Sequence, residues 1–422
     1  MQRDGGLVEL DKNENKNEHQ IDSASALQQY LDHIPISSIP AIQNSQLFQL
    51  KAADSVRDAI HMLYQKDIFG AAILDVSHSD TTPPTMTFTT SYIGIIAFSS
   101  MVLWCLQEYE KILENSMENS PKDDVPKVND IESHGFFSIL DRFPQIGQTK
   151  VGDLAKSFLW EPFFPVRLDD TILHALLLLS KHRLCLLPVA QQHGPGLIGF
   201  VTQNAVVQFL LQSSGLEWFD SVADKNFSYL SFENRKHPSC VSRGETVADA
   251  LKVLWQNQTC AVAVLDQQTK KLIGNVRNSD VYHLVNNDDL LRNRMILTVQ
   301  EFIHTEIDNI GSEHEHEHEH GGFVAARSLS LKSSFIPKMD SPVTNKEKDT
   351  LKQIMEHMTQ TNSSFSFLIN DNEQVTGLVT LRDIILQFAP PCVDSTIDGG
   401  GFFQFALEQS GCDVKNGTII RN

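Results

Sequence analysis

A short phrase that starts with glycine recurs four times along this chain, and no other feature limits the possible fold as strongly. Each copy follows an apolar, strand-like run, and each run follows a segment with the spacing of an amphipathic helix. The copies begin at Gly94, Gly199, Gly274 and Gly377. One unit of helix, two strands and helix is too small to bury its apolar face by itself. The sequence therefore predicts an α+β fold of four small repeats that pack in pairs.

Changes in composition place the boundaries of the repeats. Residues 1–33 are rich in polar residues and are expected to be mostly disordered, and the charged, proline-containing segment 108–150 is typical of a linker. A flexible insertion at 308–335 interrupts the last repeat, and residues 389–422 form a C-terminal tail. The predicted repeats are residues 34–107, 151–212, 222–286 and 297–388.

The charge balance argues against two classes of partner. The chain has 34 Lys and Arg residues against 53 Asp and Glu residues, which gives a formal net charge of −19. Nucleic acids and anionic membranes both attract a basic face, so we expect neither as a partner. The longest apolar stretch, Ile93 to Leu106, spans 14 residues and is too short to cross a bilayer.

The N-terminus and the cysteines point to a reducing compartment. Met1 to Gln20 is polar and has no apolar segment of the kind found in a secretory signal. The 6 cysteines are scattered, and no two have CxxC spacing. We therefore expect free, mostly structural thiols and a cytoplasmic and/or nuclear location.

Four stretches carry a resemblance to a known family. They are Phe158 to Phe164, Leu176 to His182, Gly215 to Phe219 and Thr380 to Ile385. With four repeats in register, the chain resembles cystathionine-β-synthase (CBS) repeat proteins, and in particular the plant branch of the gamma regulatory subunits of the AMP-activated protein kinase family. The resemblance covers about residues 34–390. It implies two Bateman modules in a flat disc, with a kinase alpha subunit and a beta subunit as partners.

The resemblance also implies where an adenosyl ligand would bind. In nucleotide-binding repeats of this kind, Gly-x-x-Ser/Thr-x-x-Asp follows the second strand, and the carboxylate accepts two hydrogen bonds from a ribose diol. The fourth repeat keeps both side chains, as Thr380 and Asp383. The third keeps Asp280 but has Arg277 instead of the hydroxyl residue, the second keeps only Thr202, and the first has lost both. The alternative is that the two carboxylates only cap helices.

Phosphate recognition has less support. By resemblance, the kinase gamma family places basic residues at the start of the first core strand of each repeat. The matching positions here are Gly70, Cys185, Cys260 and Ser364, and none is basic. The basic cluster Lys181 to Arg183 lies about three residues too early. Each charged hydrogen bond that is lost costs roughly 1–3 kcal/mol, so we expect no resident cofactor and weak or absent binding of AMP, ADP or ATP.

The run from Glu313 to His320 alternates Glu and His and formally contains H-E-x-x-H. That motif holds zinc when it lies on a helix with apolar support. Glycines flank this run and it has no apolar stripe, so we predict a solvated, low-complexity loop without a metal site. The chain also lacks phosphate-loop, nucleophile-elbow, dinucleotide and kinase signatures, which predicts a non-catalytic protein.

The leading hypothesis is a regulatory or scaffold gamma-like subunit of a plant SNF1-related serine/threonine kinase complex, with degenerate nucleotide sites. One alternative is a stand-alone CBS protein that senses an adenosyl ligand through Thr380, Asp383 and Asp280. Another is a metal-handling protein that uses the His-Glu run.

Overall fold

The computed structural model describes residues 30–39, 42, 48–75, 92–119, 135–157, 163–181, 184–191, 196–230, 238–305, 331, 337–389, 412–415 and 418–421. Several predicted features lie outside these ranges: the disorder of residues 1–29, the His-Glu run, most of the insertion at 308–335 and most of the C-terminal tail. Of the helices that the structure describes, none is both long and apolar enough to cross a membrane.

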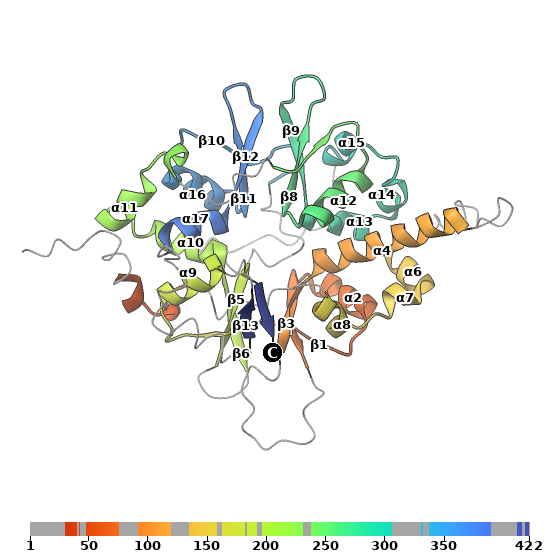
Figure 1. Cartoon of the computed structure of the whole chain (residues 1–422), viewed down its shortest axis with the longest axis horizontal. Helices are drawn as coiled ribbons and strands as arrows, with labels where there is room; N and C mark the ends of the chain where they lie inside the picture. Colours follow the sequence, from red (N-terminus) through yellow and green to blue (C-terminus); the bar gives the residue numbers. More distant parts are fainter. Residues whose placement is uncertain are drawn as a thin grey trace, which may run out of the picture.

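Four three-stranded sheets with one strand order build the molecule (Figure 1). In each sheet a short first strand pairs in parallel with a buried second strand, and the second pairs antiparallel with the third. All four antiparallel pairs shift register at the equivalent place. The strands are β1 (Gln49–Lys51), β2 (Gly70–Leu74) and β3 (Tyr92–Ala97); β4 (Val166–Arg167), β5 (Leu186–Ala190) and β6 (Leu197–Thr202); β7 (Cys240–Ser242), β8 (Ala261–Leu265) and β9 (Leu272–Arg277); and β10 (Thr344–Lys346), β11 (Phe365–Ile369) and β12 (Val375–Thr380).

A helix connects the first two strands of every sheet, since a parallel pair needs a crossover. These helices are α2 (Val56–Lys66), α9 (Ile172–Lys181), α12 (Val247–Asn257) and α16 (Leu351–Gln360). Each begins after a hydroxyl side chain that accepts a hydrogen bond from the backbone N–H three residues later: Ser55, Thr171, Thr246 and Thr350. A second helical element follows the third strand: α4 (Phe98–Asn119), α10 (Gln203–Leu211), η4 (Asn278–Asp280) with α13 (Val281–Asn286), and α17 (Leu381–Phe388).

The segment that leads into each of the first two repeats packs on the other one. η1 (Ile36–Ser38) lies beside the start of α9, where Ile36 N donates to Asp170 O over 2.7 Å. α8 (Val151–Ser157) lies against the first repeat, where Val151 N donates to Asp54 O over 2.9 Å. In sequence each segment stands at the start of one repeat, within the predicted ranges 34–107 and 151–212, while in space it covers the other repeat.

The third and fourth repeats exchange their leading segments in the same way. η3 (Phe227–Tyr229), which follows α11 (Glu217–Ala223), pairs with the fourth repeat through Phe227 N and Asp349 O at 2.9 Å. α15 (Val299–Ile303), which follows α14 (Asp288–Asn293), pairs with the third through Val299 N and Glu245 O at 2.8 Å. As in the first pair, apolar burial and backbone pairing place each leading segment beside the crossover helix of the other repeat, although in sequence it precedes its own repeat.

The sheets of consecutive repeats face each other. Ala261 and Ala263 of β8 form one cluster with Phe365 and Phe367 of β11, which joins the third repeat to the fourth. Tyr92 of β3 stacks on the ring that precedes β4, Phe163, with centroids 4.4 Å apart, which joins the first repeat to the second. The repeats thus form two pairs, as predicted for two Bateman modules.

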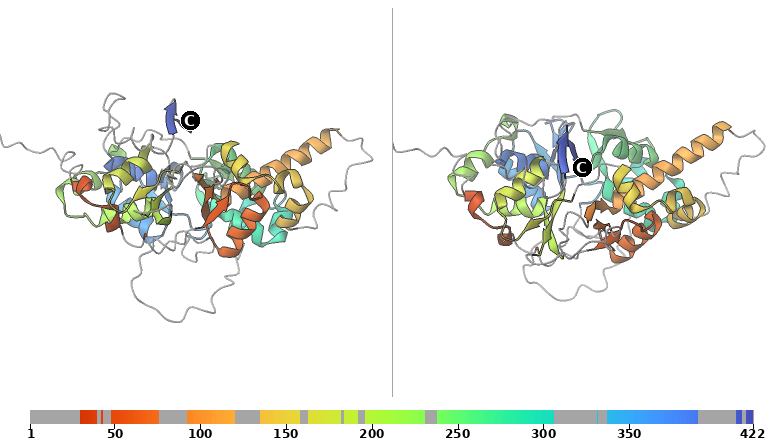
Figure 2. Two further views of the ribbon diagram at one scale, coloured as in Figure 1. Left: turned by 90° about the horizontal axis from the view of Figure 1, so that it is seen from below. Right: turned by 60° about the horizontal axis from the view of Figure 1, so that its bottom comes forward.

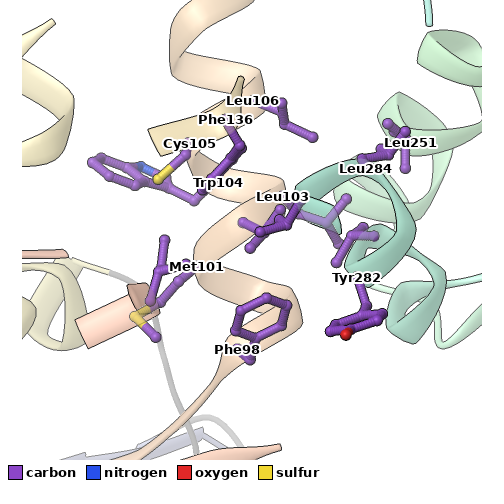
Figure 3. Packing of buried hydrophobic residues seen from close by; sticks show 14 of the residues in the cluster. Phe98, Met101, Leu103, Trp104, Cys105, Leu106, Phe136, Leu251, Tyr282 and Leu284 are labelled. Atoms are coloured by element: carbon purple, nitrogen blue, oxygen red, sulfur yellow. The ribbon is translucent and has the colours of Figure 1, made fainter. Parts of the chain in front are cut away.

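Two helical cores join one pair to the other. One core combines the first and third repeats, and Figure 3 shows α4 residues such as Phe98 and Leu103 lying toward Tyr282 and Leu284. The other combines α9 and α10 with α16 and α17. Around the centre, sheets and helices alternate in one flattened layer (Figures 1 and 2). This confirms the predicted α+β disc of four repeats.

The segment predicted as a linker, 108–150, contains regular structure. α4 continues to Asn119, and α6 (Phe136–Arg142) and α7 (Pro144–Gly147) follow. Phe136, Leu140 and Ile146 are buried in the core of the first and third repeats. Burial of these apolar side chains stabilises the folded segment despite its many charged residues. The predicted tail likewise contains a hairpin, β13 (Cys412–Lys415) with β14 (Thr418–Arg421).

The exchange of leading segments predicts where a core mutation acts. Ile36 is fully buried on the second repeat, so Ile36→Ala should destabilise it by about 2–5 kcal/mol. Hydrogen exchange at the Ile172 amide, which donates to Ile34 O, should accelerate. The matched variant Val151→Ala should instead accelerate exchange at Val56, whose amide donates to Thr149 O. The opposite pattern would show that each segment stabilises the repeat that follows it.

A buried histidine predicts acid sensitivity. His174 on α9 is 8% exposed, and burial lowers its pKa from 6.5 to about 4. His174 is therefore protonated below pH 6.5 in the unfolded chain but only below about pH 4 in the folded chain. As the pH falls from 6.5 to about 4, the free energy of unfolding should decrease by about 3 kcal/mol at most. Urea unfolding of His174→Gln should show a shallower pH dependence than that of the wild-type chain; equal slopes would contradict the assignment.

Candidate functional site

The turn between the third strand and the second helix is the same structural position in all four repeats. The first residue of the second helical element donates its backbone N–H to the carbonyl of the residue before the second strand. The four pairs are Phe98 with Phe69, Gln203 with Cys185, Asn278 with Cys260, and Leu381 with Ser364, over 2.7 to 3.3 Å. This shared bond places Thr380, Arg277, Thr202 and Ala97 at one position, and Asp383, Asp280, Ala205 and Ser100 at another.

The fourth repeat has a capping box at this turn. Asp383 Oδ2 accepts hydrogen bonds from Thr380 N at 2.8 Å and from Thr380 Oγ1 at 2.7 Å. Within the part of the chain that the structure describes, no hydrogen bond reaches Asp383 Oδ1. The carboxylate is partly exposed and adds a negative charge beside Cys260 of the facing third repeat. This acid therefore caps α17 and still has an oxygen that could accept a hydrogen bond.

The third repeat has a closed ion pair at the same turn. Arg277 donates to both oxygens of Asp280: Nη2 to Oδ1 at 2.7 Å, and Nε to Oδ1 and Oδ2 at 3.0 and 3.1 Å. Arg277 N adds a bond of 2.7 Å to Oδ2. Asp280 is 3% exposed and Arg277 is 9% exposed. We predicted Asp280 as a ribose acid, but in the structure its acceptors are occupied by the arginine that replaces the hydroxyl residue.

The sequence showed Arg277 only as a replacement of the hydroxyl residue, and its pairing with Asp280 was not predicted. The available signal was the spacing of a basic and an acidic residue three positions apart across a strand–helix turn, where the capping-box geometry brings the two together. The pair also affects its surroundings. Burial lowers the pKa of His283 on α13, while the nearby Asp280 carboxylate opposes that shift.

The second repeat lacks an acid at the turn. Thr202 caps α10 by accepting from Ala205 N at 3.2 Å, and the alanine offers no carboxylate to a ligand. In the first repeat Ala97 ends β3 directly before α4. Of the four predicted site residues, the structure brings Thr380 and Asp383 together at the fourth turn, whereas Asp280 and Thr202 lie at the equivalent turns of the third and second repeats.

The positions at which the resemblance implies phosphate-binding cations contain no basic residue. Cys185 is exposed. Burial raises the pKa of the Cys260 thiol to about 12, and the charge of Asp383 adds to this. Arg382, which is next to Asp383 in sequence, donates from Nε to Ser180 O near the C-terminal end of α9 over 3.0 Å. This guanidinium contacts the second repeat, where it complements the end of a helix dipole.

Other candidate sites are poorly supported. A surface cavity of about 290 Å³ is lined by Pro35, Ser37, Leu168, Asp169 and Ala190. None of the predicted ligand residues lines it. Within the described ranges, no three His, Cys, Asp or Glu side chains gather closely enough to hold a metal ion.

Comparison with known families agrees with this architecture. Residues 151–212 and 339–389 match the family model of the CBS domain. Two segments of this chain are CBS domains. They coincide with the second repeat and with most of the fourth, and the other two repeats share their strand order.

Curated relatives of this chain are kinase subunits. The chain is 25% identical over 366 residues to the SNF1-related protein kinase regulatory subunit gamma-1 of Arabidopsis thaliana, covering 84% of this chain and 81% of that protein. It is 23% identical over 411 residues to the gamma-1-like subunit of the same plant, covering 85% and 86%. These similarities support a regulatory CBS protein.

A solved structure shares the fold of this chain. The crystal structure of a protein from Methanocaldococcus jannaschii, described as a proposed archaeal homologue of g-AMPK, superposes with a TM-score of 0.51 at 15% identity. The match covers 84% of this chain and all of that one. At this identity the similarity shows the fold alone.

Two substitutions at Asp383 can separate the effect of its capping hydrogen bonds on stability from the effect of its charge. Asn can still accept from Thr380 N and Oγ1, so Asp383→Asn should change the free energy of unfolding by less than about 0.5 kcal/mol. Asp383→Ala loses the capping box and should cost about 1 kcal/mol. Thermal and urea unfolding would measure both. Equal losses in the two variants would show that the charge, not the cap, carries the stability.

Proposed function

We propose that this chain is a non-catalytic regulatory or scaffold gamma-like subunit of a plant SNF1-related serine/threonine kinase complex. The proposal rests on one combined observation: four CBS-type sheets form a single disc, and the similarity to two plant kinase gamma subunits runs through more than four-fifths of the chain. Its partners would be a kinase alpha subunit and a beta subunit, in the cytoplasm and/or nucleus.

The disc suits a docking role because its parts are mechanically joined. Sheet contacts hold each pair, and the two helical cores hold one pair to the other. Polar bonds cross between the pairs as well: Arg382 Nε donates to Ser180 O, and Asn204 Nδ2 donates to Asn362 Oδ1 over 3.2 Å. A partner that bound edges of two repeats would therefore meet a preformed surface and would lose little freedom on binding.

Degenerate nucleotide sites are part of the proposal. The four strand–helix turns differ: one has a carboxylate with an open oxygen, one has a carboxylate closed by Arg277, and two have no acid. None of the four positions before the second strands is basic. The phosphates of AMP, ADP or ATP would thus gain little charge-assisted hydrogen bonding, and binding should be weak or absent.

A stand-alone adenosyl sensor is the second candidate, and the open oxygen of Asp383 is the observation that favours it. Asp383→Asn distinguishes the two functions. A scaffold should keep its partners in this variant, while a ligand-gated sensor should lose its thermal stabilisation by AMP. Metal handling receives no support from the part of the chain described here.

Co-expression tests the leading proposal. The full chain should co-purify in equal molar amount with SNF1-related kinase alpha and beta subunits, and Asp383→Asn should do the same. Phe388→Ala is the matched folding control, since Phe388 is fully buried and stacks on Phe219 at 5.3 Å. It should lose about 3–5 kcal/mol of stability and reduce recovery of the complex. A folded wild-type chain that recovers neither kinase subunit would exclude the proposal.

A further inference from the structure

The third repeat contains a side chain that occupies the place of a ligand. We propose that Arg277 is a permanent internal occupant of this repeat: its guanidinium takes the acceptors that a ribose diol would need and so excludes adenosyl ligands from the third strand–helix turn. The inference deepens the proposed function, because it identifies the residue that decides whether this repeat can take a ligand.

The acceptor capacity of Asp280 carries the first step. A carboxylate has about four lone-pair positions. Here three N–H groups of Arg277 converge on the carboxylate: Nη2 donates to Oδ1, the backbone N donates to Oδ2, and the single Nε–H is shared between both oxygens, all within 2.7 to 3.1 Å. The two hydroxyl donors of a ribose would have to displace the guanidinium. That displacement would leave a cation in a site where the arginine is 9% exposed, which is strongly unfavourable.

The guanidinium also contacts a segment outside this turn. Arg277 Nη1 donates to Pro337 O over 2.7 Å. Pro337 begins the stretch that leads to β10 of the fourth repeat, and this stretch runs along β9, where Asn275 N donates to Met339 O over 2.9 Å. The arginine therefore fills the space between the turn and that stretch, and it links the two repeats of the pair without a ligand.

The fourth repeat shows what the turn is like without the arginine. Thr380 occupies the equivalent position and uses its backbone N and Oγ1 on a single oxygen, Asp383 Oδ2. The shorter side chain cannot reach across to a neighbouring segment. The difference between an open and a closed carboxylate thus follows from one residue, Thr380 or Arg277, on the same backbone turn.

The experiment converts the third turn into a copy of the fourth. Adenosine, which has the ribose diol but no phosphate, is the probe, and binding to the purified full chain is measured by equilibrium dialysis. Arg277→Thr should bind one more equivalent of adenosine than wild type, with an affinity at least about tenfold above that of Arg277→Thr/Asp280→Asn. The gain should persist in Arg277→Thr/Asp383→Asn. A folded Arg277→Thr chain without this gain would overturn the proposal.

A second measurement does not depend on the folding of the arginine variant. Asp280→Asn in the otherwise wild-type chain, measured on protein shown to be folded, should leave adenosine binding unchanged, because a site closed by Arg277 contributes none. A loss of binding in this variant would show that the third repeat already holds ligand and would refute the occupant role. Neither measurement involves kinase subunits. Failure of this inference can therefore be distinguished from failure of the proposed function, which the co-purification test would reveal.

Discussion

Uncovered apolar surface on both sides of a small sheet is the constraint on which this structure depends. A three-stranded sheet with two helices buries one side of itself and leaves the other side and much of its helical surface exposed. In this chain the sheet side of each repeat is covered by its pair mate, and the helical side is covered by a repeat of the other pair. The disc is the arrangement in which all four repeats satisfy both requirements together.

The exchange of leading segments strengthens that arrangement. Four apolar residues, Ile36, Val151, Phe227 and Val299, anchor these segments on the pair mate, each beside the N-terminus of a crossover helix. The backbone bonds at these points satisfy donors that a helix start leaves without intrahelical partners. Each pair is thereby closed by chain connectivity as well as by packing, so one repeat cannot fold completely without the other.

One backbone turn, used four times, has different chemistry in each repeat. The turn geometry is fixed by strand pairing and by the bond from the second helix to the residue before the second strand, whatever the side chains are. The side chains at two positions then decide between an open carboxylate, a closed ion pair and no acid. Such divergence is expected where the repeats are retained for assembly, since packing constrains the core residues and leaves the turn residues free to change.

Local periodicity and phrases that recur in register were enough to predict the number of repeats, their strand and helix order and the equivalence of the four turns. They were not enough for residues 108–150, where the many charged residues conceal the apolar pattern of the buried Phe136, Leu140 and Ile146. The tertiary structure was needed to establish that the first repeat shares a helical core with the third, and the second with the fourth. It also decided which repeat each leading segment covers and that Arg277 closes Asp280. These outcomes depend on which surfaces and polar atoms meet in space, and a one-dimensional pattern of apolar and polar residues is compatible with several such pairings.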